Sequence, residues 1–554
     1  MNKVWWKETV VYQVYPRSFK DSNGDGIGDL QGLISKLDYL KDLGIGVIWI
    51  CPMYKSPMDD NGYDISDYQA IHEEFGTMAD FDQLMAECKR RDIRLIIDLV
   101  INHTSDEHPW FLESRSSKDN PKRDWYIWRD GKDGKEPNNW ESIFGGPAWK
   151  YDEKTKQYFM HIFSSRQPDL NWENLDMRQA VYSMIRWWLD RGIDGFRIDA
   201  ISHARKEPGL ADMPNPKGLE YVPSYDKHMN VPGIQTYIRD LCDNTFNHYN
   251  IMTVGEANGV SAENADEWVG EEQKKFNMLI QFEHVGLWDK NPDQRFNMQD
   301  LKRVFSRWQK GLENRGWNAL FVENHDVPRI ISKWGETGAM WRESATAIAM
   351  MYFNMQGTPF IYQGQEIGMT NTQFDGPQDF NDVSAKNYFT NRRKQGASDK
   401  EITAELTPTT RDNARTPMQW NAEKNAGFST GAPWLKTNPN YPQINVETEQ
   451  KDPNSILNFY RKLIQIRKNN EVMVYGSYDL VLPEHQQVYA YTRTLGSAKV
   501  LVISNLTKTA ASCDFAGMEL HSDKLMLQNY EVSAHGAVSK IELRPFEARM
   551  YRLN

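Results

Sequence analysis

Three short hydrophobic runs in this chain stop abruptly at carboxylates. GFRIDA contains Asp199, IMTVGEA contains Glu256, and NALFVENHD ends at Asp326. Short β-rich runs that end at charged residues are typical of buried parallel strands whose carboxyl ends meet solvent. In a (β/α)8 barrel these ends lie on one face, where residues distant in sequence share a pocket. The pattern therefore predicts a barrel with three carboxylates in one site.

The first hundred residues alternate strand-like and helix-like segments. The strand-like runs are VVYQVYP, VIWICP and RLIIDLVINH, and the amphipathic runs between them are LQGLISKLDYLKDLG and DFDQLMAECKRRDI. This rhythm predicts parallel strands joined by right-handed crossovers. The later strands are predicted at GFRIDAI, IMTVGEA, NALFVENHD and GTPFIYQGQEIG.

The chain has 554 residues, which is long enough for a barrel with additional modules. The alternation stops from Thr104 to about Asn174, which predicts a small insertion domain after the third strand. After about Gly476 only strand-like runs remain, which predicts a C-terminal antiparallel β-sandwich. The expected architecture is an α/β TIM barrel with these two modules. Its boundaries are 1–103 and 175–476 for the barrel, 104–174 for the insertion and 477–554 for the sandwich.

Composition and local sequence exclude several classes of protein. A net charge of −11 argues against a nucleic-acid partner. The four cysteines lie far apart without a C-x-x-C motif, which argues against a zinc site or a disulfide framework and favours a reducing compartment. We find no secretory signal, and the most apolar stretch, AIAMMYFNMQGTPFIY, is too interrupted to span a membrane. We expect a soluble cytoplasmic protein, a monomer or weak homo-oligomer, without a membrane partner.

Four motifs occur in a fixed order: DLVINH, GFRIDA, GEA and ENHD. This order resembles the four sequence regions of glycoside hydrolase family 13, the α-amylase family. MDDNGYDISDY, QPDLNWEN and RDNARTPMQW narrow the resemblance to the oligo-1,6-glucosidase and α-glucosidase group of that family. The resemblance runs from about Lys7 to the end of the chain. It implies a retaining glycoside hydrolase that acts on small oligosaccharides.

The resemblance assigns a role to each acid. It implies that Asp199 is the nucleophile, Glu256 the general acid and then base, and Asp326 the stabiliser of the transition state. Retaining glycosidases hold nucleophile and acid about 5 to 5.5 Å apart, so that a covalent glycosyl-enzyme forms before water enters. Neighbouring acids also shift each other's pKa values, which separates a proton donor from an ionised nucleophile. Arg197, two residues before Asp199, points to the same side of the predicted strand and is expected to keep that carboxylate ionised.

The same resemblance implies residues that bind the sugar. Four of them are expected to contact the sugar ring or form the pocket walls: Tyr63, His103, Phe163 and His325. Asp60 and Arg415 are expected to close the far end of the pocket around the outer hydroxyls. A pocket closed in this way admits only a chain end, so the enzyme is expected to release single glucose units.

The segment DSNGDGIGD offers oxygen ligands at the alternating spacing of a calcium loop. The candidate ligands are Asp21, Asn23, Asp25, the carbonyl of Ile27, and Asp29. The segment is not an EF-hand, because its twelfth position is Gly32 rather than Glu. The group that the chain resembles often carries one structural Ca²⁺ here, so we expect calcium in this loop and no cofactor for catalysis.

The residue after the nucleophile bears on which bond is cleaved. In the group that the chain resembles, it faces the leaving sugar; α-1,6-preferring members usually carry Val there, and members acting on α-1,4 bonds carry a smaller or polar residue. This chain has Ala200. We therefore expect a broad or α-1,4-preferring exo-acting α-glucosidase, with malto-oligosaccharides, isomalto-oligosaccharides or both, and sucrose, as candidate substrates. A strict oligo-1,6-glucosidase is the alternative.

Three further alternatives are open. A sucrose isomerase or transglucosidase would use the same acids, although the arginine-rich loop typical of the isomerases is not apparent after Asp326. A trehalose-phosphate hydrolase would need a phosphate pocket that the sequence does not reveal. The heavy chains of amino-acid transporters use this fold without catalysis, but they carry a membrane span and have lost catalytic acids.

Overall fold

The structure is a computed structural model that describes residues 2–287 and 296–554. Its centre is a parallel sheet of eight strands in the order β13-β12-β10-β5-β2-β1-β15-β14. The strands are β1 (Val11–Val14), β2 (Val47–Ile50), β5 (Arg94–Val100), β10 (Gly195–Asp199), β12 (Met252–Glu256), β13 (Met278–Ile280), β14 (Ala319–Leu320) and β15 (Thr358–Tyr362). A parallel bridge between Leu279 and Asn318 joins the two end strands and closes the barrel. The predicted (β/α)8 barrel is confirmed.

Period-2 alternation explains how these strands build a barrel. Val47 and Trp49 of β2 belong to the hydrophobic cluster inside the barrel, whereas Ile48 and Ile50 pack outward in the main core beneath the helices. The strands are therefore apolar on both faces. Helices surround them: α2 (Leu30–Ile34), α3 (Leu37–Leu43), α4 (Met78–Arg90), α6 (Leu175–Arg191), α8 (Ile234–Asn244), α9 (Asp266–Val269), α10 (Met298–Leu312), α12 (Trp341–Phe353) and α17 (Ile456–Asn469).

Helix α6 shows how local sequence positions the strand that carries the nucleophile. The side chain of Asn174 accepts a hydrogen bond from the Met177 N–H and caps the first turn. The helix ends at Gly192, whose φ of 102° lies in the left-handed region that favours glycine. Three residues later β10 begins, so the turn delivers the chain directly into the barrel.

The insertion after β5 contains α5 (Pro109–Ser114) and a three-stranded antiparallel sheet, β6 (Trp128–Arg129), β9 (Gln157–Met160) and β8 (Trp149–Asp152). Strand β7 (Trp140–Glu141) pairs instead with β11 (Val222–Pro223), which follows β10. A bridge between His103 and Asp169 brings the end of the insertion back to the carboxyl end of β5. The insertion therefore lies over the face of the barrel where the strands end.

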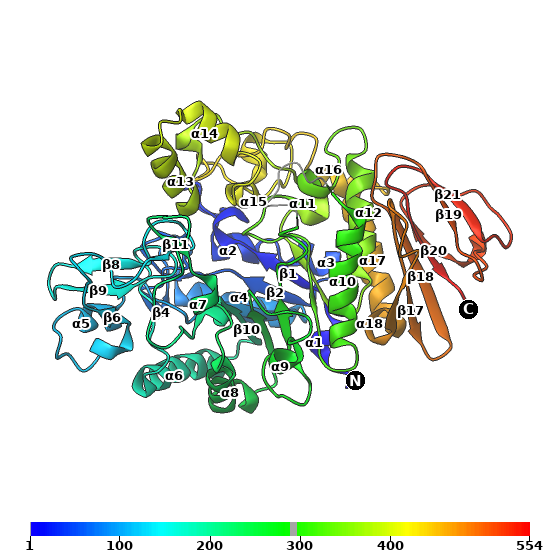
Figure 1. Cartoon of the computed structure of the whole chain (residues 1–554). Coiled ribbons are helices and arrows are strands. Elements are labelled where there is room, and N and C mark those ends of the chain that lie inside the picture. The colour runs from blue at the N-terminus through cyan, green and yellow to red at the C-terminus, as the bar shows by residue number, and fades with distance from the viewer. Residues whose placement is uncertain (1, 288–295) are drawn as a thin grey trace.

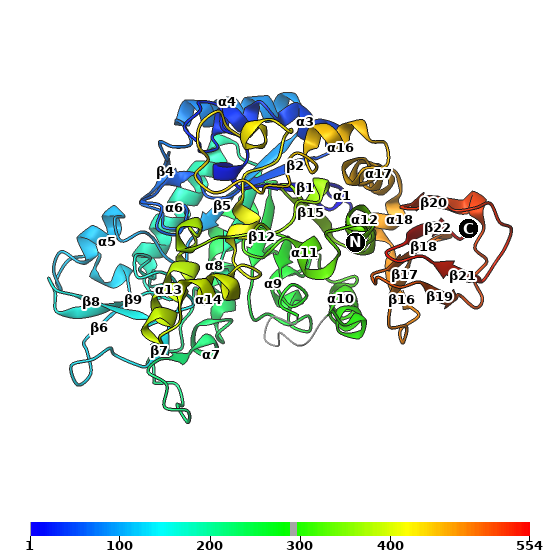
Figure 2. The ribbon, with the colours of Figure 1, turned by 90° about the horizontal axis from the view of Figure 1, so that it is seen from above.

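Two helices that the sequence analysis did not separate from the barrel, α13 (Val383–Lys394) and α14 (Asp399–Leu406), lie beside the insertion domain (Figures 1 and 2). The amide of Asn387 donates to the backbone carbonyl of Phe144, 3.1 Å away, and joins the two. A short helix, α15 (Asp412–Arg415), then returns the chain to the barrel.

The C-terminal part is antiparallel, as predicted. Its larger sheet consists of β16 (Ser477–Val481), β17 (Val488–Leu495), β18 (Ala498–Asn505), β22 (Ala548–Arg552) and β20 (Leu525–Gln528), and its smaller sheet of β19 (Ala511–Asp514) and β21 (Lys540–Leu543). This part and the insertion lie on opposite sides of the barrel in both views (Figures 1 and 2). Across the described ranges, each helix is too short or too polar to cross a membrane.

Candidate active site

The three predicted acids meet at the carboxyl ends of the strands. Asp199 is the last residue of β10, Glu256 is the last residue of β12, and Asp326 follows β14 by six residues. All three line one cavity of about 360 Å³. This volume lies within the range of small-molecule sites. The structure therefore brings together the residues whose convergence the strand pattern predicted.

A single buried guanidinium organises two of these acids. Arg197 Nη1 donates to Asp199 Oδ1 at 2.6 Å, and Arg197 Nη2 contacts Glu256 Oε2. Because both carboxyls contact one guanidinium, they lie side by side, as a retaining mechanism requires. Arg197 Nη1 also donates to Asp98 Oδ1 at 2.8 Å. The sequence analysis did not single out Asp98, although it opens the DLVINH motif and is fully buried.

The surroundings of the acids push their pKa values apart. Burial raises the pKa of Asp199 to about 7; the Arg197 guanidinium opposes this shift, and the negative charges of Asp98 and Asp326 add to it. Burial also acts to raise the pKa of Asp326, but His325, Arg411 and Arg415 outweigh it and hold that pKa well below its usual range. Asp326 is therefore ionised at neutral pH, which suits a group that stabilises positive charge.

Six of the residues predicted to bind the sugar line this cavity: Asp60, Tyr63, His103, Phe163, Ala200 and His325. The Tyr63 ring is stacked on the His325 ring with centroids 5.3 Å apart, and the Tyr63 hydroxyl lies 2.7 Å from His325 Nε2. The rings of His103 and Phe163 form another wall with centroids 5.1 Å apart. Burial lowers the pKa of both histidines to about 3, so they are neutral donors or acceptors near neutral pH.

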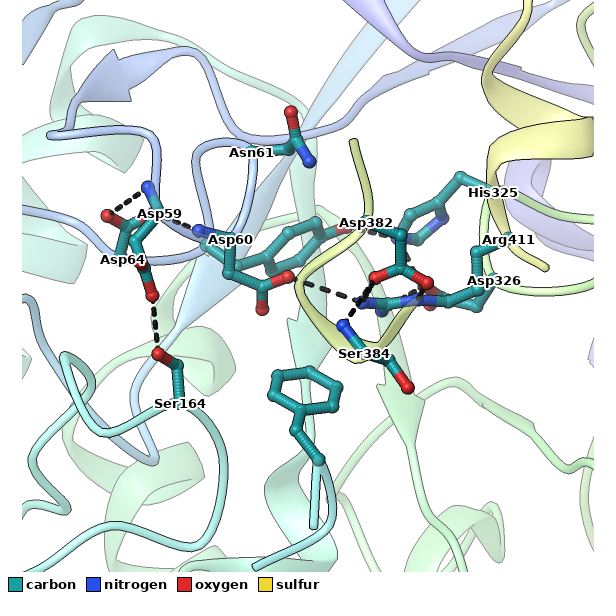
Figure 3. Close-up of polar contacts among 12 residues, drawn as sticks. Asp59, Asp60, Asn61, Asp64, Ser164, His325, Asp326, Asp382, Ser384 and Arg411 are labelled. Atoms are coloured by element: carbon teal, nitrogen blue, oxygen red, sulfur yellow. Dashed lines mark hydrogen bonds and ion pairs between the residues drawn. The ribbon is translucent and has the colours of Figure 1, made fainter. Parts of the chain in front are cut away.

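Arg415 was expected to close the far end of the pocket with Asp60, but it is not among the described residues that line the cavity. Arg411 takes that place, with its Nη2 3.4 Å from Asp60 Oδ1 (Figure 3). Arg415 lies buried behind Asp326, where its Nη2 donates to Asp326 Oδ1 at 3.1 Å and its Nε donates to the His325 carbonyl. Arg411 and Arg415 are separated by one helical turn at α15. Of these two arginines, Arg411 is the one that lines the cavity.

Arg411 also joins acids from different parts of the chain. Figure 3 shows its side chain between Asp60, Asp382 and Asp326. Asp382 and Gln167 were missed by the sequence analysis; the Gln167 amide donates to Asp60 Oδ2 at 3.1 Å. Arg411 is the first residue of the RDNARTPMQW motif and Gln167 the first residue of QPDLNWEN, so the sequence could have indicated both as site residues. Asp382 lies in none of these motifs.

The predicted calcium loop carries suitable ligand types. Its side chains offer carboxylate and amide oxygens, which Ca²⁺ prefers. In the structure these oxygens accept hydrogen bonds from the loop itself: Asp21 Oδ1 from the Gly24 N–H at 2.7 Å, and Asp25 Oδ1 from the Ile27 N–H at 2.8 Å. Asp29 Oδ1 accepts from the Gly32 N–H and caps α2. Within the part of the chain that the structure describes, no three His, Cys, Asp or Glu residues are grouped to hold a metal.

Comparison with known proteins gives matches over the whole chain. Residues 13–476 match the family described as the alpha amylase catalytic domain, and residues 478–550 match the C-terminal domain of maltogenic amylase. A probable oligo-1,6-glucosidase of Bacillus subtilis (strain 168) is 55% identical, and the match covers 100% of both chains. An oligo-1,6-glucosidase of Halalkalibacterium halodurans is 52% identical over 100% of this chain and 99% of its own. The solved structure of an isomaltulose synthase from Klebsiella sp. LX3 has a TM-score of 0.95 at 41% identity and covers 100% of both chains.

Proposed function

The chain belongs to the alpha-amylase family and is a glycoside hydrolase, and from this membership we propose that it is a retaining, exo-acting α-glucosidase. Its substrates are short α-glucosides, from which it releases glucose at the non-reducing end. The observation that carries the proposal is the pairing of Asp199 and Glu256 on one guanidinium, in a cavity bounded by Asp60 and Arg411.

In the proposed mechanism Asp199 attacks the anomeric carbon while Glu256 protonates the leaving oxygen. The product of this step is a glucosyl ester of Asp199. Glu256 then removes a proton from water, which attacks the same carbon from the opposite side and frees glucose. Asp326 is ionised and stabilises the positive charge that develops on the ring in both steps.

The proposed exo action follows from the way Asp60 and Arg411 bound one side of the cavity. Asp60 and Arg411 approach from different segments to 3.4 Å, and both line the cavity. Their charged groups suit the outer hydroxyls of a terminal sugar, and a chain that continues past them would meet both side chains. The enzyme should therefore act on chain ends.

Bond preference depends on the region around Ala200, which also lines the cavity. A methyl side chain leaves more space for the leaving sugar than the valine of α-1,6-preferring members, so we propose a broad or α-1,4-preferring enzyme. The names of the Bacillus and Halalkalibacterium relatives favour a strict oligo-1,6-glucosidase as the second candidate. The similarity to isomaltulose synthase keeps a sucrose isomerase as the third.

The deciding experiment compares kcat/KM for glucose release from maltose, isomaltose and sucrose. The wild type should act on maltose at least as well as on isomaltose, and Asp199→Asn should be inactive on all three. Exclusive action on isomaltose would establish a strict oligo-1,6-glucosidase, and conversion of sucrose to an isomer would establish a sucrose isomerase. A fully active Asp199→Asn variant would refute the mechanism.

Ala200→Val tests the bond preference, and it should move the ratio toward isomaltose. Ala200 has a φ of 44°, where a β-branched side chain is strained, so the assay belongs well below the Tm of the variant. An unchanged ratio would remove Ala200 as the determinant.

We also propose one structural Ca²⁺ in the loop formed by residues 21–29, held by Asp21, Asn23, Asp25, the Ile27 carbonyl and Asp29. The oxygen ligands support this proposal, and catalysis itself proceeds through the chain's own acids. A cytoplasmic location is supported by the cysteines, because all four are buried free thiols. A monomer or weak homo-oligomer is the proposed form, since the residues described build the site within one chain.

A further inference from the structure

We propose that Asp382 is a positioning residue that holds Arg411 in the orientation that closes the sugar pocket. This inference rests on the proposed function, because that function assigns Arg411 and Asp60 to the terminal sugar. Asp382 follows the last barrel strand and precedes α13, far in sequence from the strand ends that carry the catalytic acids. It acts on the sugar through Arg411.

The Arg411 guanidinium makes two hydrogen bonds to Asp382 and one to each of its other acidic neighbours. Arg411 Nη2 donates to Asp382 Oδ1 at 2.5 Å and Arg411 Nε donates to Asp382 Oδ2 at 3.1 Å, which makes a two-pronged ion pair. Asp326 receives one bond from Arg411 Nη1 at 3.0 Å, and Asp60 lies 3.4 Å from Nη2. Two parallel bonds fix the plane of a guanidinium, whereas one bond allows it to rotate.

Asp382 can fix this plane because its own position is fixed twice. The Asp412 carboxylate accepts from the backbone N–H groups of Asn381 at 2.9 Å and of Asp382 at 3.1 Å. The side chain of Asp382 in turn caps α13 by accepting from the Ser384 N–H at 3.1 Å. Arg411 and Asp412 are adjacent, so one holds the side chain of Asp382 and the other its backbone.

The charges around Arg411 show what Asp382 prevents. Asp60 and Asp326 both offer oxygens to the sugar in the proposed function. A guanidinium without Asp382 would be neutralised by these two acids alone and would be drawn toward them. Phe144, whose ring centroid lies 5.0 Å from the guanidinium carbon, attracts the cation but does not fix its rotation. Asp382 therefore keeps the oxygens of Asp60 and Asp326 available to the substrate.

The test is a double-mutant cycle on glucose release, with Asp382→Asn, Arg411→Lys and the double variant. Asp382→Asn keeps the shape of the side chain and removes its charge. It should lower kcat/KM about 10- to 100-fold, because small displacements of positioning groups have effects of this size. Arg411 contacts the terminal sugar in the bound substrate as well as in the transition state, so most of the loss should appear as a higher KM. Glucose should also inhibit the variant more weakly. Asp382→Glu should restore part of the loss.

The cycle separates positioning from a general structural role. In the Arg411→Lys background, Asp382→Asn should change kcat/KM less than about threefold, because lysine cannot make the two-pronged contact that fixes the guanidinium plane. Asp399→Asn is the matched control. Asp399, at the start of α14, accepts two hydrogen bonds from Arg393 in an exposed ion pair. Its substitution should leave both kcat/KM and KM unchanged. The Tm of each variant shows whether it folds.

Two results would overturn the inference. One is a kcat/KM for Asp382→Asn within threefold of the wild type. The other is a loss that is equally large with and without Arg411, which would make Asp382 a structural residue only. An inactive wild type on every α-glucoside would instead refute the proposed function, so the two failures are distinguishable.

Discussion

Arg197 determines the electrostatics of the catalytic acids because three carboxylates depend on one cation. Asp98 and Asp199 both accept from its Nη1, and Glu256 contacts its Nη2. Asp98 is also held by Trp49 Nε1 at 3.1 Å and by the Tyr63 hydroxyl at 3.2 Å. Asp98 therefore holds the arginine in place, but its negative charge raises the pKa of Asp199 and so works against the ionisation of that acid.

This opposition predicts the effect of Asp98→Asn on the pH profile. The pKa of Asp199 is about 7, and the attacking carboxylate must be ionised, so kcat/KM should fall as the pH falls through about 7. Without the negative charge of Asp98 the proton on Asp199 is held less tightly, so the acid limb should move to lower pH. The measurement is kcat/KM for maltose from about pH 5 to 9, with the Tm as a control for folding.

The direction of the shift also identifies the titrating group. Burial raises the pKa of Asp60 to about 7 as well, and Asp60 lies against Arg411 rather than Asp98. If the acid limb keeps its position in Asp98→Asn, Asp60 is the group that it reports, and the assignment of the limb to Asp199 is wrong.

At this scale the sequence predicted side chains that share a strand end or a motif, and it failed where two candidates were one helical turn apart. Asp199 and Glu256 could be placed because each ends a hydrophobic run. Arg411 and Arg415 lie in the same motif, and only packing decides which of them enters the cavity. Asp382 could not be predicted, because its role comes from a contact with Arg411 across 29 positions.

Helix α10 connects the barrel to the C-terminal sheets through one buried lysine. Lys302 Nζ donates to the carbonyls of Leu482, Pro483 and His485 at 2.6, 3.3 and 2.8 Å. These carbonyls belong to the turn between β16 and β17, and only 2% of Lys302 is exposed. The ammonium thus satisfies backbone acceptors of a different module.

Lys302→Met should therefore destabilise the protein without affecting catalysis. The substitution keeps the aliphatic stem but leaves three acceptors without their donor, which costs about 1 to 3 kcal/mol. Lys310→Met is the matched control on the same helix, because Lys310 reaches Asp479 of β16 from an exposed position, where ion pairs contribute little. Thermal scans at one heating rate should show a lower Tm for Lys302→Met alone, with kcat/KM unchanged in both. An equal Tm for the two variants would contradict this role for Lys302.

Elements were predictable where they carry several periods of a regular pattern, or where a motif follows them as it follows β14. The long runs of β5 and α6 carry several periods of their pattern, whereas β13 has three residues and was not predicted. Strand β13 is recognised by its partners, since Val254, Gly255 and Glu256 of β12 pair with Met278, Leu279 and Ile280. Helices α13 and α14 fall inside the range 175–476 that the sequence predicts as barrel, although they lie beside the insertion domain.

On the scale of the whole molecule, the loop formed by residues 21–29 joins the start of the barrel to a segment late in the chain. The Asp21 N–H donates to the Phe428 carbonyl at 3.1 Å, and the Ser429 hydroxyl donates to Asp21 Oδ2 at 2.5 Å. At Gly26, with a φ of 92°, a Cβ would lie 1.8 Å from the carbonyl oxygen of Ala432. A cation in this loop would therefore stabilise the contact between two distant parts of the fold.

Chelation should then lower the Tm of the intact protein, and added Ca²⁺ should restore it. A ligand that binds only the folded state stabilises it by about 2.7 kcal/mol at a hundred times its Kd. Asp25→Asn is the informative variant, because the Asn oxygen can still accept from the Ile27 N–H while the negative charge for a cation is lost. Its Tm should no longer respond to chelator, and elemental analysis should find one calcium per chain in the wild type and less in the variant. A wild type that contains no calcium and keeps its Tm in chelator would show that hydrogen bonds within the loop are sufficient, and that the barrel does not need the ion.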